Sequence, residues 1–264
     1  MTDLIVYTAR KIHTMEPSQP VGQAIAVREG TILEIGTLES LSPWLERYPH
    51  KIDTTFEEKI ILPGFIDPHL HPSMASVILP MQFITALEWK LPWGTSPAVG
   101  SREAYLKALA SHASEPNDAP FFTWGYHRDW HGNITRPDID AICPDRPVIV
   151  WHRSFHEVIM NSAALAHFNL ETDAIAAHPQ IDLAQGKFFE TGLRLAIAAL
   201  NPVLMSPEHF GLGIARLKQV AHFGGHTLVG DMGIGIFNFD MEWQAACASP
   251  VSYTHLTLPT TTIV

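Results

Sequence analysis

The stretch "ILPGFIDPHLHP" (residues 61–72) places two histidines, His69 and His71, one residue apart directly after an apolar run. Side chains alternate between the two faces of an extended strand, so both imidazoles would point to the same side. Two imidazoles on one face at the end of a buried strand can hold a metal ion. The chain has 15 histidines in 264 residues, and such a composition produces this spacing about once by chance. The flanking sequence must therefore decide what the pair means.

The composition is that of a globular protein with a real core, since 46% of the residues are hydrophobic and 17% are charged. A formal net charge of −10, without basic clusters, argues against nucleic acid and anionic membranes as partners. The only cysteines, Cys143 and Cys247, lie far apart, which suits a reducing compartment. Neither a signal peptide nor a membrane span is predicted, so the sequence indicates a cytoplasmic protein.

The first 62 residues predict a small β-rich unit. The segment "LIVYTARKIHTM" (residues 4–15) predicts a pair of strands, and "AIAVREGTILEIG" (residues 24–36) predicts a hairpin that turns at Glu29 and Gly30. A short helix ending at Pro49 follows, and residues 51–71 predict two more strands. Apolar residues at 60–66 lack clean alternation, which is typical of a parallel-sheet strand covered on both faces.

Strands and helices alternate between residues 72 and 233. Residues 72–100 predict a loop with a short helix, and residues 120–127, 146–154 and 226–233 predict strands, the last of them buried. Helices are predicted at 101–114, from Asn161, at 191–204 with a break at Pro202, and after Ser206. Ser101, Asn161 and Ser206 are suitable N-caps. Strand–helix–strand units of these lengths indicate an α/β protein with a parallel sheet.

Together these motifs resemble the amidohydrolase superfamily, and within it the YtcJ-like branch (amidohydrolase family 3). Residues 4–36 look like the N-terminal β-sandwich segment of that branch, and "ILPGFIDPHLHP" is similar to its first barrel strand with the metal-binding histidine pair. The segment "RPDIDAICPDRPVIVWHRSFHEVIMNSAAL" (residues 136–165) resembles its insert, and "GGHTLVGDMG" (residues 224–233) resembles its second barrel strand. The likeness extends over roughly residues 4 to 240.

The resemblance implies a (β/α)8 TIM barrel with a β-sandwich built from both ends of the chain. By match, His69 and His71 are metal ligands for one or two divalent ions, of which zinc is the expected one. The metal would lower the pKa of bound water and polarise the scissile carbonyl. The family's carboxylated lysine, later histidines and catalytic aspartate have no counterparts here, so no catalytic residue is assigned. A full barrel needs on the order of 250 residues, so an incomplete barrel, the N-terminal portion only, is expected.

The expected domain organisation has three parts. Residues 1–62 would form part of a composite β-sandwich, and residues 63–248 would hold the first barrel strands around an α/β insert at about 72–205. The final segment "SPVSYTHLTLPTTTIV" (residues 249–264) is crowded with threonine and matches no family element. We interpret this tail as translated sequencing-adapter read-through, and the alternative is a genuine β-tail.

Other histidines recur four residues apart, a spacing that makes a ligand pair only on a helix. The pairs are His127 and His131, His152 and His156, and His222 and His226. At each pair, glycines or a predicted strand argue against a helix, so we interpret these residues as surface or core histidines.

Three further residues are candidates for contacting a substrate. His156 and Glu190 lie in stretches that resemble the family's insert, where residues can line a pocket. Asp231 lies near the end of the second barrel strand, and barrel strands present their C-terminal ends to the active site.

Two functions remain open. The first is a metal-dependent amidohydrolase that cleaves C–N bonds of amides, formamides or cyclic amides with metal-activated water, here truncated and inactive. The second is a non-catalytic α/β protein that binds a small molecule or a partner. The expected partners are a small-molecule substrate and, through unpaired strand edges, further copies of the chain.

Overall fold

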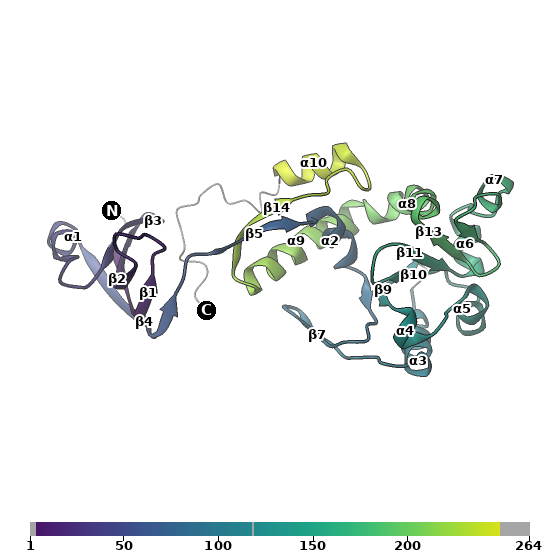
Figure 1. Cartoon of the computed structure of the whole chain (residues 1–264), viewed down its shortest axis with the longest axis horizontal. Helices are drawn as coiled ribbons and strands as arrows, with labels where there is room; N and C mark the ends of the chain where they lie inside the picture. The colour runs from purple at the N-terminus through teal and green to yellow at the C-terminus, as the bar shows by residue number, and fades with distance from the viewer. Residues whose placement is uncertain (1–3, 118, 249–264) are drawn as a thin grey trace. The chain divides into compact units, whose positions relative to one another are not determined.

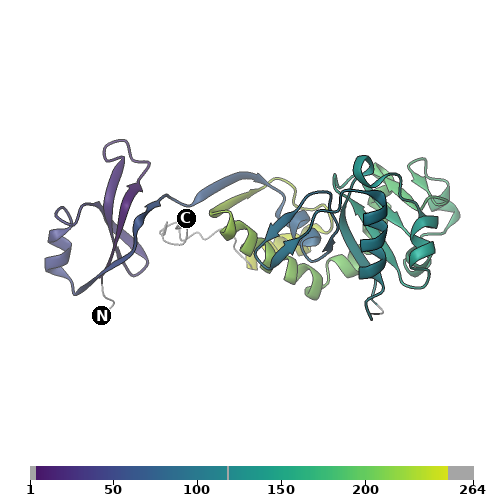
Figure 2. The same cartoon turned by 90° about the horizontal axis from the view of Figure 1, so that it is seen from below.

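The computed structural model describes residues 4–117 and 119–248, and the tail predicted at 249–264 lies outside this range. The chain divides into two compact units, which we describe separately (Figures 1 and 2). Of the described residues, the first unit holds residues 4–71, 218–233 and 244–248. The second unit holds Pro72–Leu217 and Ile234–Trp243.

A four-stranded sheet of order β3-β2-β1-β4 dominates the N-terminal part of the first unit. Its elements are β1 (Leu4–His13), β2 (Val21–Arg28), β3 (Thr31–Gly36), α1 (Ser42–Arg47) and β4 (His50–Ile61). Glu29 and Gly30 join β2 to β3 with positive φ angles of 51° and 78°, the signature of a type I′ hairpin. The predicted β-rich unit and its hairpin are therefore present.

The prediction of a strand pair at residues 4–15 is wrong, because β1 is one continuous strand. It pairs antiparallel with β2 and parallel with β4, and its register shifts between Thr8 and Ile12 on one side and at Ala9 on the other. Register shifts of the β-bulge kind bend a strand locally and increase its twist without ending it. The ten residues of β1 therefore form one element.

The first unit also contains a two-stranded parallel sheet of β5 (Phe65–Leu70) and β14 (His226–Asp231). Both predicted strands are present, but neither is buried as predicted. Phe65 and Ile66 are 45% and 60% exposed, and β14 is half-buried along most of its length. Within the described residues β5 pairs with β14 alone, and the exposure of Phe65 and Ile66 shows that the strand is not covered on both faces.

The second unit is built on a six-stranded mixed sheet of order β12-β13-β11-β10-β9-β6. Its strands are β6 (Gln82–Phe83), β9 (Phe121–Tyr126), β10 (Val148–His152), β11 (Glu157–Met160), β12 (Ile181–Asp182) and β13 (Lys187–Phe189). Strands β6, β9 and β10 run parallel, whereas β11 is antiparallel to β10 and to β13. A separate hairpin joins β7 (Trp89–Leu91) to β8 (Gly94–Ser96). The C-terminal ends of β9 and β10 and the N-terminal end of β11 thus share one edge.

The helices of residues 4–117 and 119–248 pack mainly in the second unit. Besides α1 they are α2 (Pro72–Ile78), α3 (Arg102–Ala113), α4 (Arg128–His131), α5 (Arg136–Ile142), α6 (Ser162–His167), α7 (Asp173–Ala176), α8 (Glu190–Leu204), α9 (Pro207–Phe223) and α10 (Phe239–Ala248). Helices α3 and α5 contribute Tyr105, Leu109 and Ile139 to a core shared with β9, β10 and β11. Helix α8 contacts β11 and β13 (Figure 1).

The predicted N-caps are confirmed. Ser101 Oγ accepts from Ala104 N–H at 3.2 Å, and Ser206 Oγ accepts from His209 N–H at 3.2 Å. The predicted break at Pro202 is wrong, because α8 continues to Leu204. Proline removes the hydrogen bond to the carbonyl four residues earlier. That residue, Ala198, is exposed, so water can satisfy its carbonyl.

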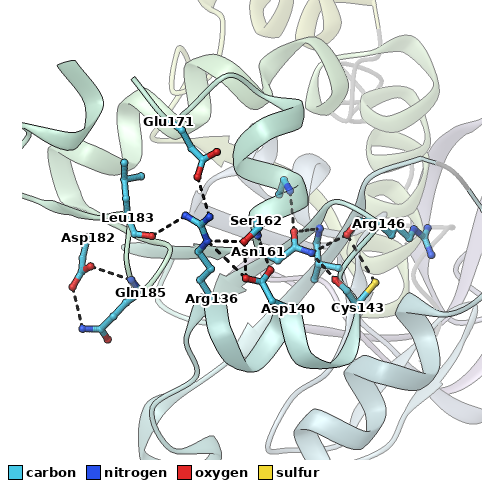
Figure 3. A network of polar contacts seen from close by, with 12 residues as sticks. Arg136, Asp140, Cys143, Arg146, Asn161, Ser162, Glu171, Asp182, Leu183 and Gln185 are labelled. Carbon is cyan, nitrogen blue, oxygen red and sulfur yellow. Dashed lines mark hydrogen bonds and ion pairs between the residues drawn. The ribbon is translucent and has the colours of Figure 1, made fainter. Parts of the chain in front are cut away.

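A buried polar network holds the segment that resembles the family's insert (Figure 3). Asn161 is fully buried and uses its whole amide: Nδ2 donates to the carbonyls of Cys143 and Arg146 at 2.8 and 2.9 Å. Its Oδ1 accepts from the backbone N–H groups of Val148 and Ala164, both at 2.9 Å.

The same network anchors α5 to α6. Asp140 accepts from the Ser162 backbone N–H at 2.7 Å and from its hydroxyl at 2.6 Å. Arg136 donates from Nε to Ser162 Oγ at 2.8 Å and pairs with Glu171 at 2.9 Å (Figure 3). These polar residues of the motif are accordingly structural.

Candidate functional site

The histidine pair lies at the C-terminal end of β5. His69 is the fifth residue of the strand, and His71 follows Leu70, its last residue. The two ring centroids are 5.4 Å apart with an interplanar angle of 87°. The rings are therefore neighbours, as alternation along an extended chain predicts.

Hydrogen bonding leaves this pair ready for a ligand. Asp67 Oδ1 accepts from the His69 backbone N–H at 3.1 Å, which orders the chain just before the pair. His71 Nδ1 is buried and finds no hydrogen-bond partner within the described residues. A buried polar atom without a partner costs about 1–3 kcal/mol. A metal ion or a hydrogen-bond donor at His71 Nδ1 would remove that cost.

Asp231 lies on the neighbouring strand at the level of the pair. It is opposite Leu70 in the β14–β5 register, and Met232 N–H donates to Leu70 O at 3.0 Å. The Asp231 carboxylate is exposed, and its Oδ1 accepts from Gly233 N–H at 2.9 Å. No group of three or more His, Cys, Asp or Glu side chains placed for a metal occurs in residues 4–117 and 119–248. The site as described offers two imidazole ligands.

His156 and Glu190, two other candidates, are brought together in the second unit. The His156 ring and the Glu190 carboxylate are 3.2 Å apart, and Glu190 N–H donates to His156 O at 3.2 Å. Glu190 has a φ of 42°, a left-handed conformation that is unusual for a residue with a side chain. Both side chains are more than half exposed. The pair forms at the edge of the sheet where β11 begins and β13 ends.

Sequence reasoning missed two further histidines at this edge. His127 follows β9 and His152 ends β10, and their ring centroids are 5.2 Å apart. Burial lowers the pKa of His152 to about 4, with further lowering by the neighbouring His127 and Arg128 side chains. Part of a signal was available, because the predicted strand at residues 120–127 ends at His127, whereas the strand predicted at residues 146–154 runs two residues past His152. The interpretation of His131 as a core histidine is confirmed, because the residue is fully buried. The prediction that no helix occurs at His127 and His131 is wrong, because α4 runs from Arg128 to His131 with His127 as its N-cap.

A buried ion pair lies beside these histidines. Glu157 and Lys187 are 7% and 3% exposed, and their charged atoms are 3.9 Å apart. Arg128 Nη2 lies 3.7 Å from the other oxygen of Glu157, and Lys187 Nζ donates to Asn133 Oδ1. Burial raises the pKa of Glu157 and lowers that of Lys187, and each charge partly offsets the shift of the other.

No helix among the described residues combines the length and apolarity needed to span a bilayer. The strands of the described residues form four separate sheets, and none closes into a barrel. No protein-family model matches the chain.

Individual proteins do match. "Exoenzymes regulatory protein AepA" of Pectobacterium carotovorum subsp. carotovorum is 26% identical over 174 residues, covering 63% of this chain and 35% of that protein. "Putative amidohydrolase YtcJ" of Bacillus subtilis (strain 168) is 28% identical over 163 residues, which cover 58% of this chain and 27% of that protein. "N-substituted formamide deformylase" of Arthrobacter pascens is 25% identical over 172 residues, which cover 62% of this chain and 29% of that protein. The chain thus spans about a third or less of the length of these relatives.

A solved structure shares the fold. The uncharacterized metal-dependent hydrolase from Pyrococcus horikoshii OT3 superposes with a TM-score of 0.67 at 20% identity, over 94% of this chain and 47% of that one. An α/β fold similar to that of metal-dependent hydrolases is therefore confirmed. The sequence matches and this partial coverage agree, and the chain is related to the N-terminal portion of the YtcJ-like proteins of the amidohydrolase superfamily.

Proposed function

We propose that the chain is part of a metal-dependent amidohydrolase that cleaves C–N bonds of amides, formamides or cyclic amides, with His69 and His71 as two ligands of a divalent metal. The observation that carries the proposal is the orphaned Nδ1 of His71, beside the ring of His69 at the end of a parallel strand. Neutral imidazole nitrogen is a good ligand for zinc, the expected ion. The residues present therefore fit a metal.

A bound divalent ion would supply Lewis acidity toward a carbonyl group and toward water. The chain's own residues would hold and orient that ion. Asp67 orders the backbone of His69, and the register between β5 and β14 keeps Asp231 near the pair. We assign no general base. His156, Glu190 and Asp231 stay proposals for substrate contact, and a small molecule is the proposed substrate.

We also propose that β5 and β14 are the first two strands of a (β/α)8 barrel, with residues 72–205 as an insert between them and residues 1–62 as part of a β-sandwich. The parallel pairing of β5 with β14, two strands that lie far apart in the sequence, supports this proposal. The exposure of Phe65 and Ile66 supports it too, because neighbouring barrel elements would cover them. We expect this chain by itself to bind metal weakly and to lack hydrolase activity.

The test compares metal binding with activity. Cobalt(II), a coloured substitute for zinc, is titrated into the chain and into His69→Ala, His71→Ala and the control His178→Ala, whose histidine lies in the second unit. We expect weak absorption changes that both site variants abolish and the control retains. A full-length protein containing this segment is then screened for metal-dependent release of amine from formamides and cyclic amides. Unchanged cobalt spectra in both site variants would refute the ligand assignment.

The alternative is a binding protein without catalysis. It is favoured by the two-ligand site and by a relative that carries a regulatory name. A full-length protein that binds small amides without turnover, in the presence of zinc, would favour this alternative.

A further inference from the structure

His127 and His152 share one local geometry at the ends of the adjacent parallel strands β9 and β10. The Nδ1 of His127 accepts from the backbone N–H of Asp129 at 3.2 Å. The Nδ1 of His152 accepts from the backbone N–H of Ser154 at 3.0 Å, and the Ser154 hydroxyl lies 2.7 Å from the same nitrogen. Each ring is thus tied to the N–H two residues further along the chain.

These bonds determine the tautomer of each ring. A ring nitrogen that accepts a hydrogen bond carries a lone pair, so in the neutral imidazole the proton must reside on Nε2. Both histidines therefore present an Nε2–H donor, which leaves no lone pair there for a metal ion. Burial lowers the pKa of His152 to about 4, so its ring is neutral at physiological pH.

Neither donor has an acceptor within residues 4–117 and 119–248. Neither Nε2 is among the buried unpartnered atoms, so solvent reaches both. The two rings lie side by side, with centroids 5.2 Å apart and an interplanar angle of 36°. His152 ends β10 opposite Tyr126 of β9, and His127 directly follows Tyr126, so the two rings belong to neighbouring strand ends.

A cation stands next to this pair of donors. The side chain of Arg128 is 54% exposed and lies 3.7 Å from Glu157, so part of its guanidinium faces solvent, where a ligand can reach it. The two acidic side chains nearby interact with other groups. Glu157 is paired with Lys187, and Asp129 approaches His127 from the Nδ1 side, at 3.9 Å.

We propose that His127, His152 and Arg128 form a binding site for the carboxylate group of a small molecule. A carboxylate has two oxygens that can accept from the N–H donors of the two neighbouring rings, and the guanidinium supplies the opposite charge. Hydrogen bonds to an ionised acceptor are about twice as strong as neutral ones. The site therefore prefers a carboxylate to an uncharged amide of the same shape.

The test uses acetate as the probe and acetamide as its uncharged match. The chain is labelled with ¹⁵N-histidine, and long-range ¹H–¹⁵N spectra identify which nitrogen of each ring carries the proton. We expect Nε2–H tautomers for His127 and His152, and acetate-dependent shifts of these two Nε2 signals. Acetamide should bind at least about tenfold more weakly, a difference of about 1.4 kcal/mol.

Two variants separate binding from folding. Arg128→Met changes a side chain that is 54% exposed, so the fold should survive, and acetate binding should weaken about tenfold. A melting curve of the variant measures any stability lost with the Glu157 contact. His178→Gln is the matched control. The Nδ1 of His178 also accepts from a backbone N–H two residues further along the chain, that of Gln180. Its Nε2, however, already has a neighbour, because it lies 3.4 Å from Thr191 Oγ1. This control variant should leave acetate binding unchanged. Nδ1–H tautomers, equal binding of acetate and acetamide, or an unaffected Arg128→Met variant would each overturn the proposal.

Discussion

Stability should depend on the protonation of His152 in a way that can be measured. The ordinary pKa of histidine is 6.5, and burial lowers that of His152 to about 4. Between these values the unfolded chain binds the proton and the folded chain does not. Because the unfolded state binds more protons there, the free energy of unfolding rises with pH from about 4 to 6.5.

The size of the effect follows from the shift. One pKa unit corresponds to about 1.36 kcal/mol, so a fall from 6.5 to about 4 amounts to about 3 kcal/mol. The ring is only half-buried, and solvent screening reduces the expected contribution to about 1.5 kcal/mol. The neighbouring side chains of His127, Arg128 and His156 add to the lowering of the pKa, and Asp129 opposes it.

The assay is urea unfolding of the wild type and of His152→Gln between pH 4 and 8. All other groups titrate in both proteins, so the difference between the two free energies isolates His152. The wild type should gain about 1.5 kcal/mol relative to the variant between pH 4 and 7. Parallel curves, or a wild type that gains stability on acidification, would refute the assignment of a neutral, half-buried ring.

Three further predictions concern the buried groups and the metal. Lys187→Met should lower the free energy of unfolding by about 3 kcal/mol at pH 7, because it leaves the charge of Glu157 buried without this partner. Adding Glu157→Gln should recover most of that loss, and a double-mutant cycle measured by urea unfolding tests both values. Asn161→Leu removes four hydrogen bonds to buried backbone groups and should cost at least about 4 kcal/mol by chemical denaturation, whereas a loss below about 1 kcal/mol would contradict the network. A chelator should barely change the melting temperature of the chain, because His69 and His71 supply half of a tetrahedral shell, and a stoichiometric metal that survives dialysis would show that other ligands complete the site.

Local chemistry made much of the fold predictable. Ser101, Asn161 and Ser206 were recognisable as caps, because each satisfies backbone N–H groups that a helix leaves open. Glu29 and Gly30 were recognisable as a hairpin turn from their position between two apolar strands. The adjacency of His69 and His71 needs only an extended backbone. These features depend on neighbours within about four residues, which the sequence displays directly.

Features that depend on distant partners were not predictable in this way. Whether β1 is one strand or two depends on bulges in its pairing with β2 and β4. The exposure of Phe65 depends on which elements pack against β5, and an apolar run shows only that burial is favourable. Helix α8 continues through Pro202. The carbonyl of Ala198, which loses its hydrogen bond to the proline, belongs to an exposed residue and can bind water, and helix propensity alone does not reveal that exposure.

The same limit explains why the adjacency of His127 and His152 was not predicted. Spacing along the chain identifies ligand partners only within one element, and His127 and His152 belong to two. Their adjacency follows from the order β10-β9 in the sheet, and their donor character follows from N–H groups that point back at Nδ1 from Asp129 and Ser154. Chemistry at the end of a parallel sheet is assembled across strands, so the residue that ends each strand is the unit to compare. The predicted strand at residues 120–127 ends at His127, but the strand predicted at residues 146–154 passes His152 by two residues, so bringing these two histidines together depends on where β10 ends and on its place beside β9 in the sheet.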